Sequence, residues 1–249
     1  MRLKKVTGFI VYGFSLGEAD QIISCFTSSG NLQKFVAKGS RKVKSKSAAA
    51  VQLFMLGEYV IYCGKGLPFL RQADIIDSFN PLRTSWAKSG AAFAVMELCR
   101  LLIAEEARET EAFALVMSYM FHLKKEDYNP LVFDAFRLQL VASLGYEMGF
   151  THCAACGCSL NAGCLQWSAG GALCSQCSKH SQYGMLAGQD NLALLHVIGH
   201  HSFSQLAELQ FSSAQALAAR KYVDSLINWL TEGKTKAQAF RSLFETDGN

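Results

Sequence analysis

Two pairs of cysteines carry the clearest chemistry in this sequence. Cys153 and Cys156 form one C-x2-C pair, and Cys174 and Cys177 form a second after seventeen intervening residues. Two such pairs can place four thiolates at the corners of a tetrahedron around zinc, with zinc–sulfur distances of about 2.3 Å. Because four protein ligands leave no open coordination position, the pattern predicts a structural zinc ion and not a catalytic one.

Neighbouring residues leave the exact ligand set open. Cys158 and Cys164 are additional thiols, and His152 and His180 are additional imidazoles, so any of them could replace one of the four. Disulfide pairing is the alternative to a metal. The nine cysteines are an odd number, and with four of them in a metal pattern they favour a reducing compartment, the cytoplasm. Between the pairs, glycines predict turns, and apolar residues predict short strands through Leu165, Trp167, Ala169 and Leu173.

A second chemical feature is positive charge concentrated near the start of the sequence. Residues 1–80 carry eleven Lys and Arg against five Asp and Glu, whereas the remaining residues carry thirteen against fifteen. Cations on a flexible Gly- and Ser-rich loop can neutralise phosphates without reading base identity, which predicts a nucleic-acid contact. The alternative is a solvated loop with no ligand. The predicted nucleic-acid-binding residues are Lys34, Lys38, Arg41, Lys42, Lys44 and Lys46.

Aromatic residues are interleaved with these cations. Those that face outward could stack on bases, each contributing about 1–3 kcal/mol. Strand alternation sends half of them inward, so we expect most to lie in a core, and the pattern selects no particular stacking residue. The candidates are Phe9, Tyr12, Phe14, Phe26, Phe35, Phe54, Tyr59 and Tyr62.

The elements that must position these residues change from strands to helices at about Pro81. Short β-branched and aromatic runs before Pro81 predict five strands, which suit a closed barrel of the OB type or a short sandwich. After Pro81, apolar residues recur at helical spacing. The predicted strands are Lys5 to Phe14, Gln21 to Thr27, Leu32 to Ala37, Leu53 to Cys63 and Phe69 to Ser78. The predicted helices are Trp86 to Ala104, Glu109 to Lys124, Pro130 to Leu144, Asn191 to His200, Ala214 to Leu230 and Lys236 to Phe244.

This order of elements predicts an α+β fold with three parts. Residues 1–80 form an OB-type domain, residues 81–150 and 186–249 form a helical domain, and residues 151–185 form an inserted zinc module. We expect no membrane span, because the best apolar stretch, Ala91 to Ala104, is short and contains Glu97 and Arg100. We also expect no secretion signal, because glycines interrupt the apolar run Val6 to Phe14 and no A-x-A cleavage site follows it.

Catalytic machinery is not evident in the sequence. His196 and His200 share one helix face, but Val197 stands where a zinc peptidase has its glutamate base, so packing or capping is the better interpretation. Gly64, Lys65 and Gly66 resemble a phosphate loop, but no Ser or Thr follows the lysine, so they predict a hairpin turn. We therefore expect a protein that is not an enzyme.

The chain resembles the RecO family of bacterial DNA repair proteins. The most specific likeness lies in the segment Ala37 to Lys42 and in the cysteine module, including Gly157, Gly170 and Gly171. Further matches are Gly17, Glu18, Asp20, the turn Thr27 to Gly30, Ser45, Gln52, Phe54, Leu144, Gly145 and Tyr146. Beyond about Ala187 the likeness is only in helical character.

The resemblance implies a nucleoid-associated recombination mediator with an OB fold, a helical domain and a zinc module. Proteins of this family bind single- and double-stranded DNA, anneal complementary strands and, with RecR, help to load RecA onto strands coated by single-strand binding protein. They recognise the acidic tail of the coating protein through the helical domain. In this sequence the possible tail contacts are Arg100, Arg137, Arg220 and Lys221.

Other functions remain compatible with the residues alone. An RNA-binding OB protein with a zinc ribbon is the nearest alternative, because phosphate contacts barely distinguish RNA from DNA. A zinc- or thiol-dependent enzyme would use Cys158, Cys164 or the His196 and His200 pair. A structural adaptor would bind no nucleic acid.

Overall fold

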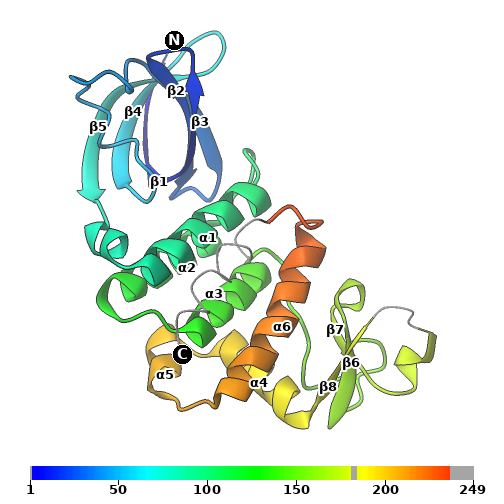
Figure 1. Cartoon of the computed structure of the whole chain (residues 1–249). Helices are drawn as coiled ribbons and strands as arrows, with labels where there is room; N and C mark the ends of the chain where they lie inside the picture. The colour runs from blue at the N-terminus through cyan, green and yellow to red at the C-terminus, as the bar shows by residue number, and fades with distance from the viewer. Residues whose placement is uncertain (1, 181–183, 236–249) are drawn as a thin grey trace. The chain divides into compact units, whose positions relative to one another are not determined.

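The computed structural model describes residues 2–180 and 184–235 (Figure 1). The described chain divides into two compact units, of which the first comprises residues 2–127 together with Thr235 and the second residues 128–234. No helix in these described ranges combines the length and the apolar character that crossing a membrane requires.

The first unit begins with a closed five-stranded barrel. Its strands are β1 (Arg2–Leu16), β2 (Asp20–Thr27), β3 (Leu32–Ala37), β4 (Leu56–Cys63) and β5 (Phe69–Asp77), in the order β1-β2-β3-β5-β4. Neighbouring strands are antiparallel except β3 and β5, which are parallel and pair at Val36 and Phe69. This confirms the expected α+β fold with an OB-type barrel. The sequence placed the start of β4 at Leu53, but residues 47–55 form turns and the strand begins at Leu56.

Strand alternation fills the barrel with apolar side chains. Ile10, Ile23, Phe35, Tyr59 and Ile61 all lie in one buried cluster inside it. The hydroxyl of Tyr59 is satisfied there, because it donates to the carbonyl of Ala50 at 3.0 Å. On each strand the residues that alternate with these core positions face outward, so the barrel surface carries polar and aromatic side chains.

Two helices complete the first unit, α1 (Trp86–Leu102) and α2 (Thr110–Lys125), after the short 3-10 helix η1 (Asn80–Thr84). Phe113 of α2 packs against Phe9 and Phe26 of the barrel, with ring centroids 5.9 and 5.4 Å apart. The N–H of Glu109 donates to the carbonyl of Gly30 at 2.9 Å, which holds the start of α2 against the turn between β2 and β3. Figure 1 shows both helices beyond one end of the barrel.

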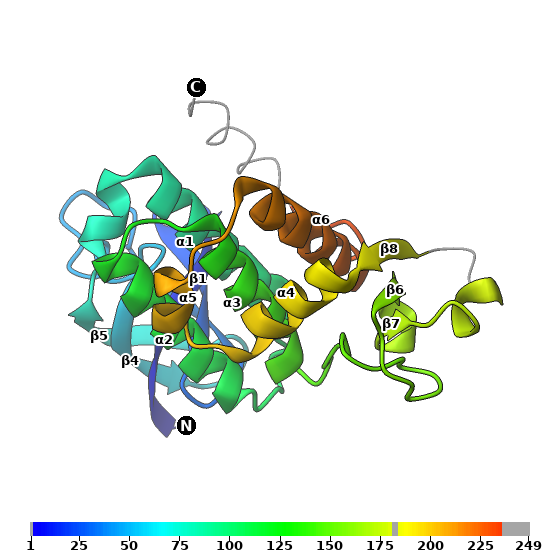
Figure 2. The same ribbon diagram turned by 90° about the horizontal axis from the view of Figure 1, so that it is seen from below.

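The second unit is built on α3 (Pro130–Ser143), which packs against α4 (Gln189–His200), α5 (Phe203–Glu208) and α6 (Ser213–Leu230). Figures 1 and 2 both show α3, α4 and α6 side by side. The short helix α5 was not predicted, because six residues carry too little periodic signal. The helix expected over Lys236 to Phe244 lies outside the described residues.

The cysteine module forms a small three-stranded sheet in this unit. Its strands β6 (Ala162–Gln166), β7 (Gly171–Leu173) and β8 (Met185–Gly188) have the order β7-β6-β8. The prediction of a strand through Trp167 and Ala169 was wrong, because these residues form the 3-10 turn η2 (Trp167–Ala169). In that turn the indole N–H of Trp167 donates to the hydroxyl of Ser225 in α6 at 3.0 Å. The module is therefore hydrogen-bonded to the helices of its own unit.

Candidate nucleic-acid interface and metal centre

The basic loop, residues 38–47, follows β3 and is anchored at its base. The N–H of Gly39 donates to Asp20 Oδ1 at 2.7 Å, and the N–H of Arg41 donates to the carbonyl of Ala19 at 3.0 Å. Ser40 is buried, and its hydroxyl bonds to the carbonyl of Ala37 at 2.9 Å. These bonds tie the start of the loop to the β1–β2 turn, so that the residues beyond Arg41 project from a fixed base.

The six predicted nucleic-acid-binding residues differ in whether their side chains have partners within the protein. Lys34 forms a 2.6 Å ion pair with Glu105, and Arg41 Nη1 donates to the carbonyl of Gly17 at 3.0 Å. The other four have exposed side chains, and none of them forms an ion pair with any residue that the structure describes. These four are Lys38, Lys42, Lys44 and Lys46. The loop therefore presents four ammonium groups that are not neutralised within the described chain.

The barrel separates the aromatic candidates into two groups. Phe9, Phe26, Phe35, Phe54 and Tyr59 are buried. Tyr12 and Phe14 are 41% and 43% exposed, and Tyr62 is half-buried on the outer face. The half-buried ring of Phe69, which was not among the candidates, lies 5.0 Å from the ring of Tyr62.

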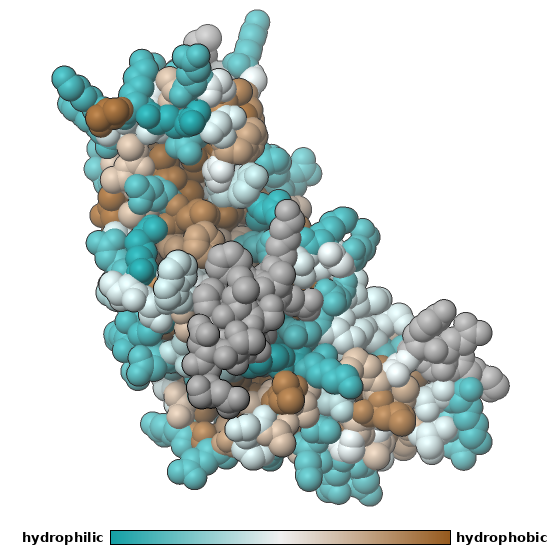
Figure 3. Space-filling view, viewed as in Figure 1, coloured by the Kyte–Doolittle hydropathy of each residue, from teal (hydrophilic) through white to brown (hydrophobic). Residues whose placement is uncertain are grey.

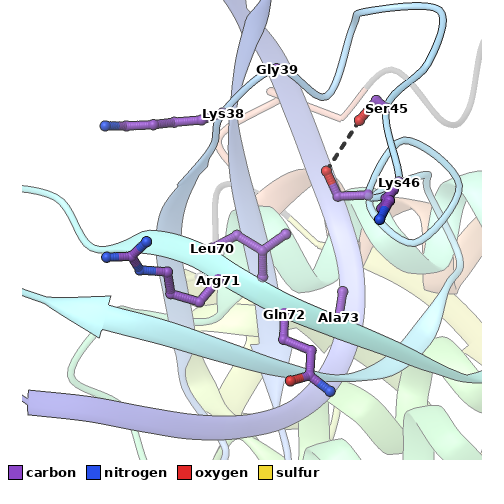
Figure 4. Close-up of a pocket in the computed structure, with 9 residues that line it drawn as sticks. Lys38, Gly39, Ser45, Lys46, Leu70, Arg71, Gln72 and Ala73 are labelled. Carbon is purple, nitrogen blue, oxygen red and sulfur yellow. Dashed lines mark hydrogen bonds between the residues drawn. The ribbon is translucent and has the colours of Figure 1, made fainter.

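A groove of about 450 Å³ lies between the basic loop and β5 (Figure 4). Its lining includes Lys38, Ser45, Lys46, Arg71 and Gln72. Figure 4 shows Lys38 and Arg71 extending toward the same side, and Figure 3 shows hydrophilic side chains projecting around the free end of the barrel. Sequence reasoning missed Arg71. The signal that could have found it is its place two residues after Phe69 in a predicted strand.

Six of the nine cysteines lie in the cysteine module, and four of their thiols form a close cluster. The Sγ atoms of Cys153, Cys156, Cys158 and Cys174 all lie within 4.8 Å of one another. The Sγ atoms of Cys156 and Cys174 are 3.9 Å apart, close to the edge of about 3.8 Å in a tetrahedron with 2.3 Å zinc–sulfur bonds. The cluster can therefore hold a metal ion, and a set of soft thiolates suits zinc.

The fourth ligand position has two candidate thiols. Cys158, which the sequence treated as a spare thiol, belongs to the 4.8 Å group, whereas Cys177 does not. Neighbouring thiols of the cluster raise the pKa of Cys177 and of Cys158 alike, so both side chains lie close to the other cysteines. The remaining alternatives are less suited, because Cys164 lies outside the group, His152 is exposed beside Thr151, and the side chain of His180 is outside the described part of the chain.

Hydrogen bonds from backbone N–H groups favour the thiolate form of the first cysteine in each pair, and the thiolate is the form that binds a metal ion. Hydrogen bonds from the N–H groups of Cys174 and Cys156 lower the pKa of the Cys153 thiol to about 6. The N–H groups of Cys177 and Gln176 likewise lower the pKa of Cys174. Each first cysteine thus receives N–H groups from the residues that follow it. Cys156 and Cys177 consequently occupy equivalent positions in the two pairs.

Three other sequence features have structural roles. The imidazole Nδ1 of His200 bonds to the carbonyl of His196 at 2.7 Å, which confirms the capping interpretation. Residues 64–68 connect the antiparallel strands β4 and β5, which confirms the hairpin turn. Arg137 was considered as a contact for an acidic tail, but its side chain is 4% exposed and paired with Asp134 and Asp224. It is therefore a structural residue.

A closed β-barrel of the OB type with exposed lysines beside a groove, and a separate thiol cluster able to hold a metal ion, place the chain among OB-fold proteins that carry an additional metal-binding module. Comparison with known proteins specifies the family. Residues 1–79 match the family model for the N-terminal part of recombination protein O, and residues 83–239 match the model for its C-terminal part. The chain therefore belongs to the RecO family of DNA repair proteins.

Individual relatives cover most of the chain. A DNA repair protein RecO of Roseiflexus sp. is 28% identical over 241 residues, which span 96% of this chain and 85% of that protein. The protein of the same name from Dehalococcoides mccartyi is 29% identical over 94% of this chain and 92% of its own length. The one from Desulfitobacterium hafniense is 32% identical over 83% of this chain and 78% of its own length.

Proposed function

We propose that this chain is a DNA-binding recombination mediator that anneals complementary strands without catalysing a covalent reaction. The observation that supports this most directly is the set of exposed lysines on the basic loop, Lys38, Lys42, Lys44 and Lys46. Cations on such a loop neutralise phosphates of any sequence and release counterions. A strand bound in this way keeps its bases free to pair.

Annealing then needs no nucleotide hydrolysis. Two complementary strands repel each other through their phosphates, and lysines bound between them lower this electrostatic barrier. Base pairing provides the free energy once the strands have met. Family membership supports the further proposal that the protein acts with RecR to help load RecA on strands coated by single-strand binding protein.

The acidic tail of the coating protein is proposed to bind the helical part of the chain. Of the four basic residues considered for it, Arg137 is buried, Arg220 is 15% exposed and lies 4.0 Å from Asp134, and Arg100 packs over the ring of Tyr12. Lys221 on α6 is exposed and is the preferred contact. Replacing it, Lys221→Ala, should weaken binding of a tail peptide, and an unchanged Kd would exclude this residue.

The metal is proposed to be a structural zinc ion held by Cys153, Cys156, Cys174 and Cys177. Four thiolates saturate a tetrahedral ion, so the ion would crosslink the two cysteine pairs and would not bind substrate. Removing it should destabilise the second unit, to which this module belongs.

The loop is tested by two double variants with the same change in net charge. Lys42→Ala with Lys44→Ala removes two loop cations, and Lys125→Ala with Lys179→Ala removes two exposed lysines outside the barrel. We expect only the loop variant to bind single strands more weakly and to reduce the slope of log K against log salt, by about 0.7 for each phosphate that the protein no longer neutralises. It should also slow annealing of coated complementary strands.

Two results would contradict the proposal. Identical affinity and salt slope in the loop variant and the wild-type protein would exclude the loop as the DNA contact. Preference for an RNA strand over the matched DNA strand in competition would favour the RNA-binding alternative, since the 2′-hydroxyl is the group that distinguishes the two polymers.

A further inference from the structure

Phe69 and Tyr62 form an aromatic pair on the outer surface of the barrel. They are cross-strand partners in β5 and β4, with ring centroids 5.0 Å apart and planes inclined by 41°. Their neighbours Ile61 and Leu70 face the barrel core, so alternation directs the two rings outward. Both rings are half-buried, which leaves part of each surface available for contact.

Two cations lie on these rings. The Nζ of Lys38 is 4.8 Å from the centroid of Phe69, and the Cζ of Arg71 is 4.7 Å from Phe69 and 5.6 Å from Tyr62. Long cationic side chains over ring faces are held by cation–π attraction. Because Lys38 and Arg71 are both exposed at the groove, they can turn to a phosphate while the ring beside them receives a base.

The groove supplies the rest of a nucleotide site. Its volume of about 450 Å³ lies within the range of small-molecule sites, and its lining includes Ser45, Lys46 and Ser47 of the basic loop. Figure 4 shows Ser45 and Lys46 on the side opposite Arg71. No carboxylate is among the residues that line it. Asp74, three residues beyond Arg71 on β5, accepts a hydrogen bond from Gln72 at 2.9 Å.

The pair is also continuous with the basic loop. The N–H of Val36 donates to the carbonyl of Pro68 at 2.8 Å, and Val36 pairs with Phe69 where β3 meets β5. Two residues after Val36 the loop begins at Lys38. A strand bound by the loop lysines therefore passes within reach of the two rings.

We propose that Phe69 and Tyr62 are a stacking platform for unpaired bases of a single strand, with Lys38 and Arg71 holding the adjacent phosphates. The proposal rests on the DNA-binding function proposed above. It adds a contact to the bases themselves, whereas the loop lysines contact only phosphates. Every base has a stacking face, so this contact discriminates an unpaired strand from a duplex without selecting a sequence.

The test compares two ligands of equal charge, an ordinary single strand and a strand of the same length whose central positions are abasic. For the wild-type protein we expect the ordinary strand to bind about 5- to 150-fold more tightly, the range for one stacked base. Phe69→Leu and Tyr62→Leu keep apolar volume on the barrel surface and should bring the two ligands to nearly equal affinity. An exposed aromatic outside the barrel strands that lines no part of the groove provides the control, Trp86→Leu at the start of α1, which should keep the wild-type ratio.

A direct contact is tested on the intact protein by photocrosslinking a strand that contains 5-iodouracil. We expect the adduct on Tyr62 or Phe69, located by mass spectrometry. The platform is refuted if both leucine variants keep the wild-type ratio of affinities, or if the adduct forms elsewhere. In that case weak binding by the Lys42 and Lys44 double variant would still support the proposed function, so the two hypotheses can fail separately.

Discussion

At the scale of single residues, the metal centre depends on which thiol completes the set. The thiols of Cys153 and Cys174 each accept hydrogen bonds from the backbone N–H groups two and three positions further along the chain. This equivalence favours Cys177 as the fourth ligand, although Cys158 lies inside the 4.8 Å group.

The matched variants Cys177→Ala and Cys158→Ala test this assignment. We expect Cys177→Ala to lose zinc and to lower the thermal midpoint, because three thiolates cannot close the coordination sphere. Cys158→Ala should keep one zinc ion per chain. The measurements are zinc content of purified protein by elemental analysis and thermal unfolding. The reverse pattern would assign Cys158 as the ligand.

Gly30 shows how one backbone position joins the barrel to α2. Its φ is +82°, and a Cβ built on it would lie 2.2 Å from the backbone nitrogen of Glu109. We expect Gly30→Ala to destabilise the first unit by more than the roughly 1 kcal/mol of the backbone term alone, because the turn and the start of α2 must also separate. Thermal unfolding measures the effect.

Gly66 provides the control for this substitution. It has a φ of +89° with no neighbouring atom within 4 Å of an added Cβ, so Gly66→Ala should cost only the backbone term. Equal midpoints for the two variants would show that the close contact at Gly30 does not matter.

At the scale of elements, a buried ionic network connects α3 with α6. Arg137 and Asp134 of α3 are 4% and 0% exposed, and Asp224 of α6 pairs with the same guanidinium. Burial of charges is costly unless they are paired, so removing one member should be more harmful than removing two.

We therefore expect Arg137→Leu alone to destabilise the second unit by up to about 3–5 kcal/mol, because the buried carboxylate of Asp134 loses its nearest cation and keeps only the more distant Arg220, 4.0 Å away. Combining it with Asp134→Leu should recover part of the loss. Denaturation of the single and double variants measures the difference. If the double variant is less stable than either single variant, the network contributes more than charge compensation.

At the scale of the whole molecule, the basic loop and the thiol cluster belong to different compact units, residues 2–127 and 128–234. Chelation of zinc should therefore lower the unfolding midpoint of the second unit while single strands still bind with nearly unchanged affinity. Titration of the intact protein with a labelled strand, before and after chelation, measures this. A simultaneous decrease in DNA binding would show that the zinc module contributes to the DNA contact itself.

The local pattern of the sequence determined much of this protein. Alternation predicted all five barrel strands, with β3 placed at its observed bounds, because a half-buried strand requires period-two burial. The two C-x2-C pairs likewise predicted a thiol cluster, since short spacing forces each pair together whatever surrounds it.

Only the tertiary structure decided which residues meet across the chain. Phe69 and Arg71 reach Lys38 because β5 pairs with β3 in a closed barrel, and no local pattern encodes that pairing. Nothing in the local sequence distinguishes Arg137 from an exposed arginine, yet packing of α3 against α6 buries it beside Asp134 and Asp224. Burial, charge pairing and cross-strand contact depend on residues distant in sequence, so they follow from packing and not from spacing.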